Sequence, residues 1–395
     1  MLLKCLEGPK NGLGIGLFNA ITQKTYTTVK DTVTNGSREV LVEPLANYNI
    51  FVVDQQFNGN SSVSLINTNV TRNGHFRDAN VTAALLDFAN KKNTLGIDAA
   101  VKHSYLNLED DNQSGFNTQF EIGKISGNYQ YSIGHELADK NYDINDLGIN
   151  FRNNYSIFSA DFSYRIFEPV GNLMNFSYNF WANYNMLYSP STYTGKNIGG
   201  SISFQEKSIL GYGGRFNYEM GKQYDYFEAR TEGRYFIYEN WVDASAWISS
   251  NYNKKYAYDA NIGFGTMFEE GRDMFNFDFG ISPRARFNDR FTLIYSLDFS
   301  NSNGGRGYIQ NIGDDIVFGQ RDRTTLVNTI TGNYNFNVFH ALSLSFRNYW
   351  SVVTYENQLY TLEDNGRLST DDGYTLDDVN NPDVNFNTWN LDFGY

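Results

Sequence analysis

Residues 175–186 read NFSYNFWANYNM, and polar and apolar side chains alternate along this stretch. The apolar or aromatic positions are the even-numbered ones: Phe176, Tyr178, Phe180, Ala182, Tyr184 and Met186. Asparagine and serine lie between them, and only Trp181 departs from the pattern. Because successive side chains of a β-strand point to opposite faces, the stretch predicts a strand with one apolar and one polar face.

The same alternation recurs along the chain. It predicts further strands at residues 158–166, 227–237, 242–249, 258–265, 275–282, 291–300, 342–352 and 388–395. A short connection between the second and third of these predicts a hairpin around Glu239-Asn240. Tight turns are also predicted at the five Asn-Gly pairs: Asn35-Gly36, Asn58-Gly59, Asn73-Gly74, Asn303-Gly304 and Asn365-Gly366. Allowing roughly 18 residues per strand and connection, we expect about 18 to 22 antiparallel strands.

Composition narrows the class of protein. The 395 residues are 16% aromatic but only 19% charged, and the mean hydropathy is −0.48. No apolar run is long enough for a transmembrane helix, whereas a transmembrane barrel gives only a weak hydropathy signal per strand. The formal net charge of −13 argues against a nucleic-acid partner, because binding phosphates requires clustered Lys and Arg.

Three features favour a membrane barrel over a soluble β-sandwich or propeller. The alternating segments are long for a sandwich strand but suit a tilted strand that crosses a bilayer. Tyr and Trp lie near segment ends, where a membrane–water interface would place them. The third feature is a charged ladder predicted on one strand and facing a wet lumen: Glu228, Arg230, Glu232 and Arg234. Structural packing in the lumen is favoured over a selectivity ring for this ladder.

The opposite faces of the predicted strands would contact lipid. The positions that we predict to face lipid are Phe176, Tyr178, Phe180, Tyr184, Phe291, Leu293, Tyr295 and Leu297. Trp181 is the exception, on the lumen side or at the interface. The prediction is therefore an all-β transmembrane antiparallel barrel, complete or incomplete, in the outer membrane of a Gram-negative bacterium.

Motifs for catalysis or cofactor binding are not found. The histidines His75, His103, His135 and His340 lie in separate segments without metal-ligand spacing, and no phosphate-binding or dinucleotide motif occurs. We therefore predict no metal, no cofactor and no catalytic residue. His135 and Glu136 remain weak candidates for an acid-base pair near a predicted strand end.

A long acidic segment is expected at residues 354–383. It carries eight carboxylates but lacks the spacing of a dedicated calcium loop, so a solvated surface is favoured over a calcium site. Residues 1–11 are interpreted as a lead-in segment, and residues 1–395 as a single barrel domain. Because residues 1–11 show no signal peptide, we expect the chain to be part of a longer exported protein.

Four stretches carry a family resemblance: residues 12–22 (GLGIGLFNAIT), 43–49 (EPLANYN), 61–70 (SSVSLINTNV) and 77–81 (RDANV). They resemble a Bacteroidota family of outer-membrane proteins with a C-terminal barrel domain of unknown function. In that family a carbohydrate-binding-module family 9-like domain usually precedes the barrel. The resemblance implies that the chain is truncated at both ends, and it implies no catalytic residue.

Two kinds of function fit these observations. The first is a non-enzymatic barrel for envelope transport or glycan-related binding, with outer-membrane lipid and glycans as partners. The alternative is a membrane-embedded hydrolase acting on lipid, peptide or glycan, or a relative of a ligand import barrel that lacks a plug domain.

Overall fold

The computed structural model describes residues 2–6, 12–34, 36–74, 76–109 and 111–395, with the backbone alone described for residues 2–6. Twenty strands belong to one large sheet, two form a separate hairpin, and the strand pairs are antiparallel. The prediction of an all-β antiparallel fold is confirmed. The one helix among the described residues is the 3-10 helix η1 (Leu376–Asp378). No helix in this part of the chain is long and apolar enough to cross a membrane.

The chain divides into two compact units. Unit 1 contains residues 1–162 and 183–193, and unit 2 contains residues 163–182 and 194–395. The strands β11 (Tyr155–Arg165) and β12 (Leu173–Met186) contribute residues to both units. Each unit is described below by itself.

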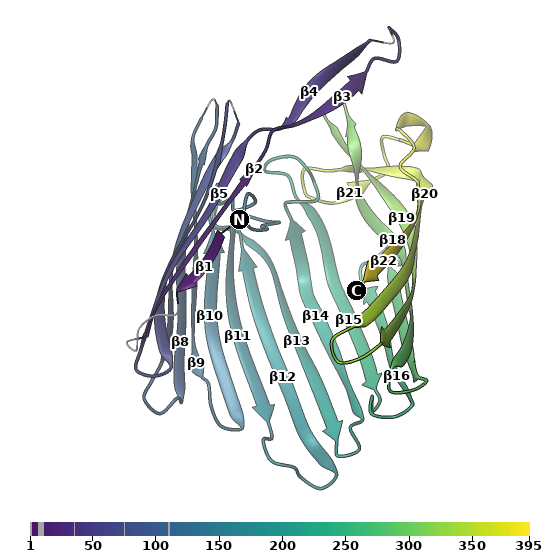
Figure 1. Cartoon of the computed structure of the whole chain (residues 1–395). Coiled ribbons are helices and arrows are strands. Elements are labelled where there is room, and N and C mark those ends of the chain that lie inside the picture. Colours follow the sequence, from purple (N-terminus) through teal and green to yellow (C-terminus); the bar gives the residue numbers. More distant parts are fainter. Residues whose placement is uncertain (1, 7–11, 35, 75, 110) are drawn as a thin grey trace. The chain divides into compact units, whose positions relative to one another are not determined.

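Unit 1 is a meander in which each strand pairs with the next, except where a hairpin is inserted. The strands are β1 (Leu2–Leu6), β2 (Leu13–Thr22), β3 (Thr25–Lys30), β4 (Ser37–Glu43), β5 (Ala46–Phe57), β6 (Ser61–Arg72), β7 (Asp78–Ala89), β8 (Leu95–Asn107), β9 (Gln113–Lys124) and β10 (Tyr129–Ala138). β2 pairs with β5, so β3 and β4 form a separate hairpin that extends beyond the ends of these two strands (Figure 1). The lead-in segment thus contains a strand, β1, which pairs with β2.

Unit 2 continues with longer strands. They are β13 (Tyr193–Glu206), β14 (Gly211–Asp225), β15 (Phe236–Ser249), β16 (Tyr256–Met267), β17 (Phe275–Arg286), β18 (Phe291–Ile312), β19 (Asp315–Asn335), β20 (Ala341–Leu362), β21 (Leu368–Ser369) and β22 (Val384–Gly394). From β13 to β20 each strand pairs with the next, and both β21 and β22 pair with β20. The expected acidic loop at 354–383 is shorter than predicted, because β20 continues to Leu362.

Most predicted strands are confirmed, but one is wrong. Segments 158–166, 175–186, 242–249, 258–265, 275–282, 291–300, 342–352 and 388–395 lie in strands to within one residue. Residues 227–237 do not form a strand, because β14 ends at Asp225 and β15 begins at Phe236. The backbone turns within this segment, where Arg230 and Gly233 both have positive φ, at +52° and +77°, and the extended conformation is interrupted twice within four residues.

Two predicted turns are bulges inside strands. Asn240 lies within β15 with φ of +56°, opposite a register shift in β14, so no hairpin forms at Glu239-Asn240. Gly304 lies within β18 with φ of +68°, at a register shift against β19. An Asn or Gly that adopts positive φ suits a bulge as well as a turn, which explains both errors.

Of the other Asn-Gly pairs, two are turns at the predicted places. Both residues of Asn58-Gly59 have positive φ between β5 and β6, and Gly366 has φ of +82° between β20 and β21. Gly74 also has positive φ, in the connection between β6 and β7. Asn35 lies outside the described residues.

Within each unit the connections differ between the two strand ends. In unit 2 the connections 207–210, 250–255, 287–290 and 336–340 lie at one end, which we call the short-loop end. The connections 226–235, 268–274 and 363–383 lie at the other, the long-loop end, together with the extended hairpin of β18 and β19. In unit 1 the connections after β5, β7 and β9 are likewise shorter than the longest ones at the opposite end, residues 23–45 and 139–154.

The most deeply buried apolar side chains of unit 2 lie at its long-loop end. We call this group the end cluster; it comprises Ala229, Phe236, Ile316, Phe318 and Leu362. Tyr238, Tyr308, Tyr360 and Leu368 pack against it. The cluster forms because β18, β19 and β20 are long, and connection 226–235 folds against their ends. The connection and these strand ends therefore make two layers at this place.

Candidate functional site: the polar face of unit 2

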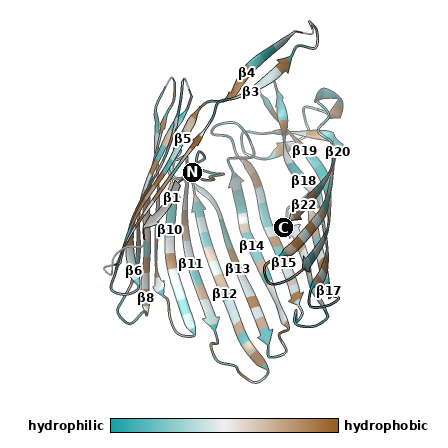
Figure 2. Ribbon diagram, viewed as in Figure 1, coloured by the Kyte–Doolittle hydropathy of each residue, from teal (hydrophilic) through white to brown (hydrophobic). Residues whose placement is uncertain are grey.

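The strands of unit 2 align into one apolar and one polar face. Figure 2 shows polar and apolar residues alternating along strands such as β12 and β14. From β15 to β20, six residues lie directly opposite one another in an apolar row: Ala246, Ile262, Phe279, Phe299, Leu326 and Trp350. One residue along, the parallel row is Ser245, Gly263, Asp278, Ser300, Thr325 and Ser351. Directly opposite residues share a face, so the sheet is two-faced over six strands.

Three tryptophans lie on the polar face, each against a glycine of a neighbouring strand. A Cβ atom on Gly199 would overlap the Trp181 indole, and one on Gly265 would overlap Trp241. The Trp247 indole lies against Gly213 in the same way, with Nε1 2.9 Å from the position of a Cβ atom. Glycine therefore lets these indoles lie close to the sheet, as flat surfaces among polar side chains.

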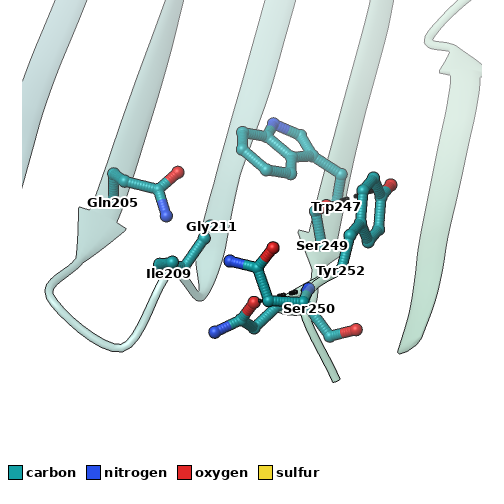
Figure 3. Close-up of a pocket in the computed structure, with 9 residues that line it drawn as sticks. Gln205, Ile209, Gly211, Trp247, Ser249, Ser250 and Tyr252 are labelled. Carbon is teal, nitrogen blue, oxygen red and sulfur yellow. Dashed lines mark hydrogen bonds between the residues drawn. The ribbon is translucent and has the colours of Figure 1, made fainter. Parts of the chain in front are cut away.

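A hollow next to Trp247 lies at the short-loop end of unit 2. Its volume is about 380 Å³, and Figure 3 shows the Gln205 amide and the Trp247 indole on either side of Gly211. The lining residues are Gln205, Ile209, Gly211, Trp247, Ser249, Ser250, Asn251, Tyr252 and Asn253. This volume lies toward the lower end of ligand pockets, roughly 300–1,000 Å³.

Hydrogen bonds hold the two turns that form this hollow. Asn251 Nδ2 donates to the Ser208 carbonyl at 3.1 Å and joins connection 250–255 to connection 207–210. The Tyr252 hydroxyl donates to the Asp259 carboxylate, and Arg286 donates to the Tyr252 carbonyl at 3.2 Å. The Asp259 contact raises the pKa of the Tyr252 hydroxyl above its ordinary value, since the carboxylate opposes a phenolate beside it.

Unit 1 carries a different feature on its polar face. Asp87, Asp98 and Glu121 lie directly opposite one another on β7, β8 and β9. Like charges in such cross-strand positions destabilise a sheet, so this acidic row does not serve stability. The three carboxylates make this part of the face locally acidic.

Four charged residues form a group at the long-loop end of unit 2, beside the end cluster. Arg367 forms ion pairs with Glu239 at 2.6 Å and with Glu269 at 3.0 Å. Arg272 lies 3.5 Å from Glu269 and over the Phe236 ring, and its side chain is only 4% exposed. Burial lowers the pKa of Arg272 below its ordinary value, and the Glu269 carboxylate opposes this shift as the anion beside the buried guanidinium.

The four residues of the predicted charged ladder lie in connection 226–235 and not on a strand: Glu228, Arg230, Glu232 and Arg234. Glu228 accepts a hydrogen bond from the Tyr308 backbone N–H at 2.9 Å. Arg234 donates to the Leu362 carbonyl at 2.7 Å and pairs with Asp364. These two attach the connection to β18 and β20. Arg230 and Glu232 are exposed.

The structure separates the two weak catalytic candidates. His135 and Glu136 are consecutive on β10 and therefore point to opposite faces. His135 Nε2 lies 2.9 Å from Ser156 Oγ, and its ring stacks on Phe158. Glu136 accepts hydrogen bonds from Tyr155 at 2.6 Å and from Asn117 at 3.2 Å. Each has structural partners of its own, and they cannot act together as an acid-base pair.

The remaining histidines are apart from one another. His103 Nε2 lies 2.8 Å from Ser114 Oγ, and His340 Nδ1 lies 2.7 Å from the Tyr395 hydroxyl. His75 lies outside the described residues. Across the described part of the chain, no group of three or more His, Cys, Asp or Glu side chains is placed to hold a metal ion.

The residues predicted to face lipid share the apolar face of their strands. On β18, Phe291, Leu293, Tyr295 and Leu297 lie opposite Tyr334, Gly332, Ile330 and Asn328 of β19. On β12, Phe176 packs against Phe204 at a ring distance of 5.0 Å, and Phe180 is 43% exposed. What contacts this face stays a prediction.

Sequence reasoning missed the hollow beside Trp247. One signal was present, since Trp247 falls among the polar positions of its strand, as Trp181 does in its own. A large aromatic residue on the polar side of an alternating strand needs a reason other than core packing. The opposing glycines could not be identified, because the register between strands is not readable from the sequence.

Comparison with curated proteins finds no match. A protein-family comparison does find one, and it covers nearly the whole chain, including the strands that form the hollow. The chain belongs to the family described as a domain of unknown function, DUF5916, whose model matches residues 7–395.

Proposed function

We propose that the chain forms the wall of an outer-membrane β-barrel in a Gram-negative bacterium, and that it is not an enzyme. Its polar face would line the interior and support solute passage or glycan-related binding. Its apolar face would contact lipid. The resemblance to Bacteroidota outer-membrane proteins supports the same location. Closure into a barrel would remove the unpaired strand edges, which a membrane does not tolerate.

The observation that carries the proposal is the pair of rows across β15–β20. The apolar row continues over six strands, while the row one residue along contains hydroxyls, a glycine and a carboxylate. A soluble sheet of this kind would need a second layer over its apolar face. Ile262, Phe264 and Phe346 on that face are instead 38–46% exposed, so the described part of unit 2 does not cover them. Lipid is a covering that suits such a surface.

Among the described residues, no group favours a catalytic role. His135 and Glu136 point to opposite faces, and each is held by its own partners. The hollow beside Trp247 is lined by amides, hydroxyls and aromatic rings and not by a nucleophile with a base. Binding is the chemistry that this lining supports.

The test compares two neighbouring positions of β12. Phe180→Arg places a charge on the apolar face and should cost about 2–4 kcal/mol if that side chain is at mid-bilayer. Asn179 lies on the polar face, with Nδ2 3.2 Å from Ser201 Oγ, and Asn179→Arg should cost far less. Both variants are refolded into lipid vesicles, and the inserted fraction is measured by heat-dependent gel mobility and protease protection.

Equal losses of insertion in the two variants would contradict the assignment of the faces. A wild-type chain that folds without detergent and ignores vesicles would overturn the membrane location itself. The full-length protein, with any segments that precede and follow this chain, should be used where refolding of the chain alone is inefficient.

A further inference from the structure

We propose that the hollow beside Trp247 is a binding subsite for a neutral saccharide, with the indole as the surface on which a sugar ring stacks. The inference deepens the proposed function and rests on it for the biological setting. The binding chemistry itself is argued from the residues of the hollow alone.

The lining of the hollow carries no charged side chain. It combines two aromatic rings, three carboxamides, two serine hydroxyls and one aliphatic side chain. A sugar offers groups that match these, because a pyranose ring has an apolar C–H face that stacks on an aromatic ring and hydroxyls at its rim that hydrogen-bond to carboxamides and serines. A site with an aromatic surface and several neutral donors and acceptors matches both parts of such a ligand.

Several polar groups of the hollow are available to a ligand. None of the hydrogen bonds among the described residues uses the Gln205 amide, the Asn253 amide or Trp247 Nε1. Gln205 and Asn253 can each both donate and accept, as a sugar hydroxyl can. Trp247 is 39% exposed, so part of its indole surface is not buried and is accessible to a ligand.

The hollow is fixed before any ligand arrives. Asn251 joins the two turns through Ser208, and its Oδ1 accepts from the Asn253 backbone N–H at 2.8 Å. Arg284 lies 4.2 Å above the centre of the Tyr252 ring and holds the tyrosine from one side. A site held by its own hydrogen bonds loses less entropy when a ligand binds.

The glycines beside Trp247 determine how the indole lies. A Cβ atom on Gly211 would be 3.3 Å from the indole ring, and Gly213 would be closer still. Side chains there would lift the ring away from the sheet. The two glycines thus allow the indole to lie close to the backbone of β14. They also leave space over Gly211 between Trp247 and Gln205 (Figure 3).

Trp181 provides a second, independent observation. Trp247 lies against Gly213, which is opposite Ser203 of β13. Trp181 lies against Gly199, which is on the same face of β13 as Ser203 and four residues before it. Arg215 is opposite Ser201, which lies between Gly199 and Ser203 on that face, and its guanidinium is 5.1 Å from the centre of the Trp181 ring. Successive residues on the same face of a strand are roughly 6.6–6.8 Å apart. The polar face beyond the hollow therefore carries a guanidinium and a second indole, groups that can contact further rings of a longer saccharide.

Other ligand classes fit this lining less well. A nucleotide would need a cationic group for its phosphates, and the two guanidinium groups at Tyr252 are already engaged, Arg284 over its ring and Arg286 at its carbonyl. An aromatic peptide could stack on Trp247 but would leave the carboxamides without hydroxyl partners. Adenosine and a tryptophan-containing dipeptide are therefore included as competitors in the test.

The experiment is a titration of the full chain, folded in detergent micelles, with the neutral tetrasaccharides cellotetraose, maltotetraose and chitotetraose. Binding is measured by calorimetry and by quenching of tryptophan fluorescence. We expect at least one of the three to bind. Trp247→Ala should weaken that binding about tenfold, which equals about 1.4 kcal/mol. Gln205→Ala should weaken it about three- to tenfold.

The matched control is Trp389→Ala. Trp389 is an exposed tryptophan of the same unit, opposite Asn348 on the other face of the sheet. It should leave the affinity unchanged. If Trp247→Ala fails to fold, as judged by circular dichroism, Gln205→Ala and Trp247→Phe carry the test. Trp247→Phe should weaken binding less than about tenfold, because the phenyl ring keeps part of the stacking surface.

The proposal is overturned if none of the three saccharides binds the folded chain, if adenosine or the dipeptide binds more tightly, or if Trp247→Ala and Trp389→Ala weaken binding equally. These results are distinct from failure of the proposed function. Loss of saccharide binding in a chain that inserts into vesicles removes only this inference. Binding by a chain that does not insert removes only the membrane location.

Discussion

Unit 2 contains two regions that are stabilised in different ways: the single layer formed by β14–β17 and the end cluster at the long-loop end. In the single layer, apolar side chains such as Phe264 remain 46% exposed. In the end cluster, Phe318 and Ala229 are fully buried. The same chain therefore leaves one apolar surface open and buries another completely.

The difference indicates where each region obtains its apolar partner. In the end cluster, connection 226–235 and β21 supply a second layer, so the free energy of apolar burial is internal to the chain. In the single layer, cross-strand hydrogen bonds hold the strands, and apolar side chains such as Phe264 stay exposed, which is the surface that our proposal assigns to lipid. Predictions that separate internal from external burial test this comparison.

The largest effect is expected from Phe318→Ala. Phe318 is fully buried and packs against Phe236 at a ring distance of 5.2 Å. Removing the ring should lower the free energy of unfolding by about 3–5 kcal/mol. The measurement is denaturant unfolding in detergent micelles. Phe264→Ala in the single layer is the matched control and should cost much less in micelles that cover its face loosely. Equal costs would erase the distinction between the two regions.

Glu269→Gln should have the next largest effect. It leaves Arg272 buried without its anion and removes one of the two ion pairs of Arg367, for a cost of about 3 kcal/mol. Asp364→Asn serves as the control, because Asp364 pairs with Arg234 but is fully exposed, and we expect no measurable change. The two variants are compared by the same denaturant titration. A Glu269→Gln variant as stable as Asp364→Asn would show that Arg272 finds another partner.

Both regions differ in how far the sequence predicts them. The strands of the single layer were predictable, because alternation such as that of Phe275, Phe277 and Phe279 with Asn276 and Asp278 follows directly from the two faces. The end cluster was not. Residues 227–237 also alternate, but Thr231 and Gly233 stood at apolar positions, and such weak alternation fits a loop equally well. The contacts that bury Ala229 come from β19 and β20, far away in sequence.

The candidate site was predictable only in part. Trp181 and Trp247 could be placed on the polar face from their position in the alternation. The opposing glycines, and the meeting of connections 207–210 and 250–255, depend on strand register and turn geometry, which the sequence does not specify. By contrast, the opposite orientation of His135 and Glu136 follows from their being neighbours on one strand.

Gly265→Ala tests local packing within the single layer. A Cβ atom at this position would overlap the Trp241 indole, so Trp241 must move, at a cost of about 1–3 kcal/mol. Gly332→Ala is the control on the other face, where the nearest atom would be 3.7 Å away, and it should be almost neutral. Unfolding and the tryptophan emission maximum are recorded for both. If Gly332→Ala costs as much as Gly265→Ala, the polar face is no more closely packed than the apolar one.

The smallest effect concerns pH and the turn at 250–255. The pKa of Tyr252 is raised above its ordinary value of 10.0, chiefly by its hydrogen bond to Asp259. A group whose pKa is raised by folding stabilises the folded state at pH values below its unfolded pKa. That contribution is lost as the pH rises through the folded pKa. Above about pH 10 the turn should therefore loosen, whereas the five apolar side chains of the end cluster carry no titrating group. Hydrogen exchange of the amides of 250–255 at rising pH, corrected for the intrinsic rate, measures this. In Tyr252→Phe the pH-dependent step should disappear, because the ring remains but the titrating hydroxyl is gone; a step that persists would assign it to another group of the turn.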